Sequence, residues 1–270
     1  MTSYPLDAVL QKLSEIAPLR LAESWDNVGL LVGNRATYVE RVMTCLTITP
    51  DVVQEAAERQ VGLIVVHHPL PFKPLSRITS DTTTGRMLLS LISHHVAVYS
   101  SHTAFDSAGD GINAQWTQML GLASVAPLEP IAGVEDGSIG SGRYGKLPQP
   151  TSLNKLAEKV AELVDAPRCR VVPSKATDRA EISKVAIACG SGGSFVAAAI
   201  RRGCDALVTG EATFHQCLEA SAGGISLILT GHFYSERFAM ERLAERLARD
   251  LNGLDVFASL LDTDPLKDAI

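Results

Sequence analysis

The sequence predicts an α/β fold made of two related lobes, for three reasons. Strongly apolar runs typical of buried strands alternate with amphipathic segments typical of helices. In both halves, these strands end on His, Asp or Glu. Between the halves, residues 127–150 shift in composition to glycine and proline. We therefore expect a first α/β lobe at residues 1–126 and a second at 127–270, with the last helix and strand able to pack back on the first lobe.

Composition limits the class of protein. The 270 residues, 46% hydrophobic and 20% charged, are ordinary for a globular chain large enough to bury a core. A net charge of -6 argues against non-specific nucleic-acid binding. The apolar runs fall far short of the roughly 20 residues that span a membrane. The N-terminus has no basic start followed by an apolar core, so we expect no signal peptide and a cytoplasmic protein.

Five cysteines occur, an odd number without any Cys-x-x-Cys pair. They lie mostly within apolar segments, which favours reduced, buried thiols over disulfides or a thiolate zinc site. A bound metal would then be held by nitrogen and oxygen.

The first lobe contains a predicted βαβ unit. Thr49 and Pro50 are a typical N-cap and first residue of a helix, and this helix lies between two apolar runs. Such a unit is almost always right-handed. The elements expected in this lobe are a helix at 6–16, a short strand ending at 32, strands at 43–48, 61–66 and 96–100, and helices at 50–60, 84–94 and up to 120.

The second lobe contains a glycine-rich loop at residues 189–194, between a strand and a helix. Its backbone amides could bind a phosphate, but no lysine occupies the P-loop position, and tight backbone packing explains the glycines at least as well. The elements expected here are strands at 169–172, 182–188, 205–209 and 225–230, and helices at 152–164, 195–202, up to 222 and from 232 to 251.

His67 and His68 end the strand at 61–66, and Pro69 restricts His68 to an extended conformation. Ligands in α/β proteins collect beyond the carboxyl ends of such strands. Because strand side chains alternate between faces, we expect the two rings to diverge and to serve two neighbouring ions rather than one. A hydrogen-bonded pair of structural histidines is the alternative.

The helix from residue 232 carries a carboxylate in its apolar stripe. Its apolar residues step by three or four positions, and the same stripe extended backward reaches Glu236 and then His232. A buried carboxylate is costly without a partner, which indicates a cation there. The alternative is an acid favoured by the first turn of a helix.

The strand at 96–100 also ends in polar groups, Ser101-His102-Thr-Ala-Phe-Asp106. Together these positions supply three imidazoles and two carboxylates: His67, His68, Asp106, His232 and Glu236. Such a set suits two divalent ions, and zinc, iron, manganese and nickel all fit. Three further residues are candidates for orienting the ligands or for proton transfer: His102 and Glu211, which follow strand ends, and His215, four residues after Glu211.

Five motifs resemble, in order, the GTP cyclohydrolase 1 type 2 homologue family, also called NIF-three-like proteins. They are Trp25-Asp-Asn-Val-Gly-Leu, Val66-His-His-Pro-Leu-Pro-Phe, Ser101-His-Thr-Ala-Phe-Asp, Val208-Thr-Gly-Glu and Thr230-Gly-His-Phe-Tyr-Ser-Glu. The resemblance implies a dinuclear metal site in a cleft between two α/β lobes, with the five ligands above and Glu236 as the bridge. It also implies a ring-shaped homohexamer, a trimer of dimers.

The activity implied by the resemblance is metal-dependent hydrolysis of a nucleotide-like small molecule, with ring opening of GTP and release of formate. Arg143, Lys146 and the glycine loop are candidate phosphate contacts. The alternatives are a non-catalytic metal-binding scaffold, metal carrier or regulatory protein, and a metal-dependent phosphoesterase. Two departures from the family pattern, Ala104-Phe105 and Phe214, remove no metal ligand but affect the cleft.

Overall fold

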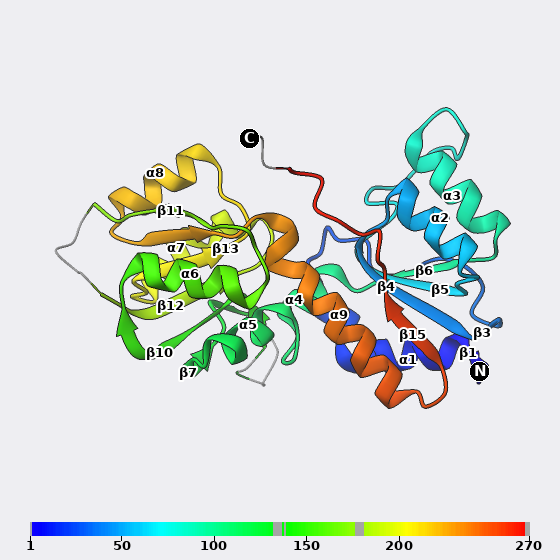
Figure 1. Ribbon diagram of the computed structural model, residues 1–270, viewed down its shortest axis with the longest axis horizontal. Coiled ribbons are helices and arrows are strands. Elements are labelled where there is room, and N and C mark those ends of the chain that lie inside the picture. Colours follow the sequence, from blue (N-terminus) through cyan, green and yellow to red (C-terminus); the bar gives the residue numbers. More distant parts are fainter. Residues whose placement is uncertain (1, 132–136, 138, 176–180, 268–270) are drawn as a thin grey trace. The chain divides into compact units, whose positions relative to one another are not determined.

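The structure is a computed structural model that describes residues 2–131, 137, 139–175 and 181–267. It divides into two compact units, Met1–Phe105 with Ala239–Ile270, and Asp106–Phe238. The predicted α/β class is confirmed, since each unit is a sheet packed with helices (Figure 1). No helix in the described part of the chain is long and apolar enough to cross a membrane.

The first unit is built on a mainly parallel five-stranded sheet with the order β15-β4-β5-β6-β2, in which only β2 is antiparallel. The strands are β2 (Gly29–Val32), β4 (Arg41–Thr47), β5 (Leu63–His68), β6 (Ala97–Ser100) and β15 (Asp255–Ala258), with β1 (Tyr4–Pro5) and β3 (Tyr38–Val39) paired separately. The helices are α1 (Leu6–Ile16), η1 (Leu19–Leu21), α2 (Pro50–Glu58) and α3 (Thr83–Ser93).

Helices α2 and α3 lie on one face of this sheet, and α1 with the second half of α9 (His232–Asp250) lies on the other (Figure 1). The predicted βαβ unit is present, because β4 and β5 pair in parallel across α2. Thr49 caps that helix by accepting a 3.3 Å hydrogen bond from the backbone N–H of Val52. A core of Val, Ile, Leu and Met side chains fills the space between α2, α3 and the sheet.

The second unit has a six-stranded sheet with the order β11-β14-β13-β12-β10-β7, whose three central members β12, β13 and β14 are parallel. The strands are β7 (Ala123–Ala126), β10 (Arg143–Thr151), β11 (Arg170–Val172), β12 (Ile182–Ala188), β13 (Ala206–Thr209) and β14 (Ser226–Leu229), with β8 (Glu129–Pro130) paired to β9 (Gly140–Ser141). The helices are α5 (Ile112–Leu120), α6 (Leu153–Leu163), η2 (Gly192–Phe195), α7 (Val196–Arg201) and α8 (Phe214–Ala222).

The chain passes between the units in two helices, α4 (His102–Ser107) and α9. From the sequence we expected a boundary after residue 126, at the start of the glycine- and proline-rich stretch 127–150. That stretch contains β8, β9 and most of β10, although residues 132–136 and 138 lie outside the described residues. The sequence did not predict β10, because Pro148 and Pro150 argue against a regularly paired strand. In the structure both prolines follow a shift in register after Lys146, so they interrupt no regular pairing.

Candidate metal centre

Three imidazoles gather at the carboxyl ends of two neighbouring strands in the first unit. His67 and His68 are the last residues of β5, and His102 follows the adjacent parallel strand β6. Each offers one ring nitrogen, and these three atoms lie within 4.8 Å of one another. The rings of His67 and His68 are 5.1 Å apart between centroids, closer than the divergence expected from strand alternation.

Hydrogen bonds at Nδ1 orient two of these rings. Thr47 pairs with His68 in the β4–β5 register, and its hydroxyl lies 2.7 Å from His68 Nδ1. The Nδ1 atom of His102 lies 2.8 Å from a carboxylate oxygen of Asp26. With Nδ1 engaged, Nε2 is the ring atom through which each histidine could bind a metal ion or contact a substrate.

Asp26 is a functional candidate that sequence reasoning missed. Its side chain is fully buried and also accepts hydrogen bonds from the backbone N–H and the hydroxyl of Thr103. Burial raises the pKa of this carboxyl, but the hydrogen bonds from His102 and Thr103 outweigh burial and lower it overall. The sequence places Asp26 inside a turn signal, 76 residues before His102, and only its place in the Trp25 motif distinguishes it.

In the second unit, polar residues likewise follow the ends of the three parallel strands. Cys189 follows β12, Glu211 follows β13, and His232 follows β14. His232 lies between two carboxylates, with Nδ1 3.3 Å from Glu211 and Nε2 3.2 Å from Glu236. These carboxylates, with the hydrogen bond to Glu236 foremost, raise the pKa of His232 to about 9. Metal binding at His232 therefore requires loss of this proton.

Glu236 occupies the position that the apolar stripe predicts. Its side chain is buried, and the residue is 3% exposed on the helix α9 that continues with the buried Met240, Leu243 and Leu247. Its carboxylate pairs with the His232 imidazole of the same unit. A buried carboxylate beside an imidazole on one helical face is an arrangement in which a divalent cation could replace the proton.

The glycine loop after β12 packs tightly against this helix. Gly190 has a φ of +61°, and a side chain there would collide with the carboxylate of Glu236. A side chain at Gly210 would also collide with its surroundings, because its Cβ would lie 2.7 Å from the hydroxyl of Ser235. The hydroxyl of Ser235 also accepts a 2.9 Å hydrogen bond from the N–H of Gly190. These contacts support the packing explanation of the glycines.

Asp106 is held in the same unit by the start of that loop. The thiol of Cys189 donates to its carboxylate at 3.2 Å, and the amide of Asn113 donates to its backbone carbonyl at 3.1 Å. Burial, reinforced by the charges of Asp106 and Glu236, raises the pKa of the Cys189 thiol well above its usual range. A protonated thiol is a poor metal ligand, so the available donors are imidazole nitrogens and carboxylate oxygens, which suits zinc, iron, manganese or nickel.

Several candidates lie outside these groups. His215 is exposed on α8, with its ring beside Phe214. Arg143, a candidate phosphate contact, is 1% exposed and donates to four backbone carbonyls, those of Gly140, Gly142, Ser107 and Ala108. Its guanidinium holds a loop and is not available to a phosphate, so that prediction is wrong.

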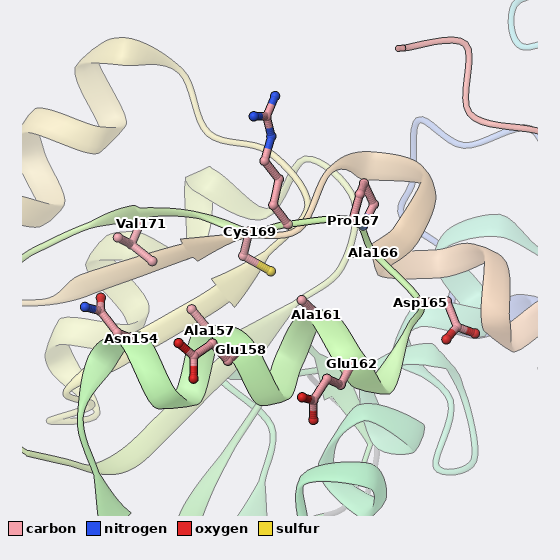
Figure 2. A pocket seen from close by; sticks show the side chains of 11 residues that line it. Asn154, Ala157, Glu158, Ala161, Glu162, Asp165, Ala166, Pro167, Cys169 and Val171 are labelled. Carbon is pink, nitrogen blue, oxygen red and sulfur yellow. The ribbon is translucent and has the colours of Figure 1, made fainter. Parts of the chain in front are cut away.

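A separate pocket of about 640 Å³ lies between α6 and the edge strand β11. Figure 2 shows Cys169 pointing from the strand side toward the helix, which contributes Glu158 and Glu162. Burial raises the pKa of this thiol to about 11. None of the residues that line the pocket is a candidate ligand.

The fold and these groups define a class of protein: an α/β protein in which imidazoles and carboxylates at strand ends could bind divalent metal ions. The family described as Duf34/NIF3 (NGG1p interacting factor 3) matches residues 5–265, and the chain belongs to this family.

Individual relatives agree with this assignment. The chain is 34% identical over 260 residues to a GTP cyclohydrolase 1 type 2 homolog of Clostridium acetobutylicum, covering 94% of this chain and 95% of that one. It is 34% identical over 263 residues to NIF3-like protein 1 of Drosophila melanogaster, covering 97% and 88%. The fold matches the crystal structure of a Bacillus cereus protein related to NIF3 with a TM-score of 0.87 at 23% identity, covering 98% and 99%.

The two departures from the family pattern differ in their surroundings. Phe105, with Ala104, is buried on α4. Phe214 is exposed at the start of α8, where Thr213 caps the helix. The first is therefore a core residue of its unit, and the second is a surface residue.

Proposed function

We propose that this protein is a hydrolase that uses two divalent metal ions and acts on a nucleotide-like small molecule. Five residues would hold the ions, with Glu236 as the bridge: His67, His68, Asp106, His232 and Glu236. The observation that supports this most strongly is the group of three ring nitrogens within 4.8 Å at the end of β5 and β6, two of them oriented through Nδ1.

The two helices that connect the units each carry candidate ligands. α4 contains His102 and Asp106, and α9 contains His232 and Glu236. Membership in the family supports these residues as one ligand set.

Divalent ions bound there would lower the pKa of a shared water toward neutrality and stabilise negative charge on oxygen. The residues of the chain have separate tasks. His102, with its Nδ1 against Asp26, can exchange a proton at Nε2. Glu211 can accept the proton that His232 releases from Nδ1.

The proposed substrate is GTP, because the Clostridium acetobutylicum relative is named as a GTP cyclohydrolase 1 type 2 homolog. Hydrolysis would add two water molecules at C8, open the imidazole ring and release C8 as formate. A phosphoesterase reaction on the same substrate would instead release phosphate or cleave a diester.

Metal analysis and a nucleotide assay test the proposal. The purified protein should contain close to two divalent metal ions per chain, and the metal-loaded protein should form formate and a ring-opened product from GTP. Glu236→Ala should lose metal and activity, and Glu245→Ala, an exposed carboxylate on the same helix, should change neither. Fewer than one ion per chain, unchanged by Glu236→Ala, would contradict the dinuclear site.

A second candidate function is a metal-binding partner of another protein without turnover. The family description names an interacting factor, and Arg143 is occupied by backbone carbonyls, which leaves the chain without this phosphate contact. A screen of nucleotides separates the two candidates, since saturable turnover that His67→Ala abolishes would exclude the non-catalytic function.

A homohexamer, a trimer of dimers, is proposed as the assembly. A closed ring would restrict access to the metal ions to small molecules. Light scattering should then report about 170 kDa, six times the 28.8 kDa of one chain. A monomer at every concentration would refute the ring and leave the ligand set unaffected.

A further inference from the structure

Two large aromatic side chains stand exposed beside the imidazole group of the first unit. Trp25 is 61% exposed and Phe72 is 49% exposed. Their ring centroids are 6.2 Å apart, and each lies 6.0 Å from the ring of His102. The pair is therefore continuous with the imidazoles of His67 and His68, whose rings lie 5.1 and 5.7 Å from His102.

Hydrogen bonds hold both loops that carry these rings. Next to Trp25, the side chain of Asp26 is tied to His102, and the amide of Asn27 donates to the carbonyl of Pro71 at 2.7 Å. Pro71 immediately precedes Phe72. The two rings are thus placed side by side by buried or partly buried polar contacts on either side of them, rather than by packing of the rings into a core.

Single exposed aromatic residues are ordinary on protein surfaces and need no function. Tyr38, on β3 of the same unit, is such a residue. Trp25 and Phe72 differ in three respects: they form a pair, their loops are pinned, and the pair borders a group of imidazoles that could bind a metal ion.

We propose that Trp25 and Phe72 form an aromatic platform that stacks against the planar heteroaromatic ring of the substrate and positions it beside His102. Flat apolar ring faces next to polar groups suit a ligand that is aromatic on its faces and polar at its edges, such as a purine base. The platform rests on the proposed function and deepens it, because it assigns recognition of the ring to residues that are not metal ligands.

Tryptophan fluorescence provides a direct test. The chain has two tryptophans, and Trp116 is 1% exposed with its indole N–H donated to the carbonyl of Ser235. Quenching by an added ligand therefore reports on Trp25. Guanosine and GTP should quench the metal-loaded protein saturably, and ribose 5-phosphate, which has no aromatic ring, should not.

Substitutions refine the test. Trp25→Ala should weaken GTP binding, measured by calorimetry, about tenfold or more, and Trp25→Phe should restore most of the affinity. Phe72→Ala should weaken it to a smaller extent, and Tyr38→Ala should leave it unchanged. Metal content should remain that of the wild type in all four variants, because none of these residues is a ligand.

The outcomes separate this inference from the proposed function. Normal metal content with equal GTP affinity in Trp25→Ala and wild type overturns the platform and leaves the metal site intact. Ring-dependent quenching in a protein that binds no metal supports the platform and contradicts the metal site. A fall in assembly mass for Trp25→Ala in light scattering would assign the pair to contacts between copies of the chain, and would also overturn the platform.

Discussion

At the scale of single residues, the hydrogen bonds that a charged side chain makes within the fold decide whether it can bind a ligand. Arg143 and Lys146 lie three residues apart on β10 and both carry a positively charged side chain, so both were candidate phosphate contacts. Only the structure shows that Arg143 is buried against four carbonyls and that Lys146 is exposed. A guanidinium with its donors engaged in the fold stabilises the protein and does not bind a ligand.

Replacement of Arg143 should therefore reduce stability rather than activity. Arg143→Met leaves several buried carbonyls without donors, and each such loss costs about 1–3 kcal/mol, so we expect a decrease of about 3 kcal/mol or more in the free energy of unfolding. Urea denaturation measures it. Lys146→Met is the matched control and should change stability by less than about 0.5 kcal/mol. Equal effects of the two substitutions would contradict the structural role.

At the scale of elements, helix α2 does more than connect β4 to β5. Its Glu55 is buried and receives hydrogen bonds from the segment that follows β15, from the hydroxyl of Ser259 and the backbone N–H groups of Leu260 and Leu261. Burial raises the pKa of this carboxyl, but these hydrogen bonds, that of Ser259 foremost, lower it overall. One carboxylate thus fastens the C-terminal segment to the first unit.

The pH dependence of stability should reveal this contact. The folded-state pKa of Glu55 lies below the 4.5 of the free group, so its contribution is complete above pH 4.5 and is lost as the pH falls through the folded value. Glu55→Gln should be less stable than wild type by about 1–3 kcal/mol at neutral pH, and the difference should shrink below pH 4.5. Thermal unfolding from pH 3 to 7 measures it.

Glu58→Gln is the control for this experiment, because Glu58 is exposed on the same helix. It should be close to wild type at every pH. A stability difference for Glu55→Gln that stays constant across this range would show that the carboxylate charge is not what fastens the segment.

At the scale of the whole molecule, the proposed metal ions should add to the stability of the folded chain. A ligand that binds only the folded protein stabilises it by mass action, by about 2.7 kcal/mol when its concentration is a hundred times Kd. We therefore expect removal of the metal ions by a chelator to lower the unfolding midpoint, and zinc or manganese to restore it. Differential scanning calorimetry measures the shift.

Glu236→Gln should abolish most of this shift, and Glu245→Gln should retain it. A chelator that lowers the midpoint of Glu236→Gln as much as that of the wild type would mean that the stabilising ion binds elsewhere. No shift in the wild type would contradict a tightly held metal site altogether.

Much of the fold was predictable from local patterns. The helix at residues 6–16, the capped helix after Thr49 and the strand at 182–188 agree with the structure, because apolar periodicity and capping residues act over short distances. β10 was not predicted, because its stability comes from pairing with β12 and β7, which is invisible in a stretch rich in glycine and proline.

By itself, the sequence determined which side chains end the strands. His67, His68, Glu211 and His232 follow directly from where each apolar run stops, and the buried position of Glu236 follows from the period of its helix. These are local properties, since strand alternation and helical periodicity depend only on near neighbours in the chain.

Only the tertiary structure decided which partners those side chains have. Asp26 meets His102 across 76 residues, Cys189 meets Asp106 across 83, and Arg143 is enclosed by a loop instead of facing solvent. The physical reason is strand pairing: β5 pairs with β6 and β12 with β13, which brings distant loops together at the carboxyl ends of the strands. Hydrogen bonds formed there set the tautomers, the pKa values and the exposed faces on which the chemistry depends.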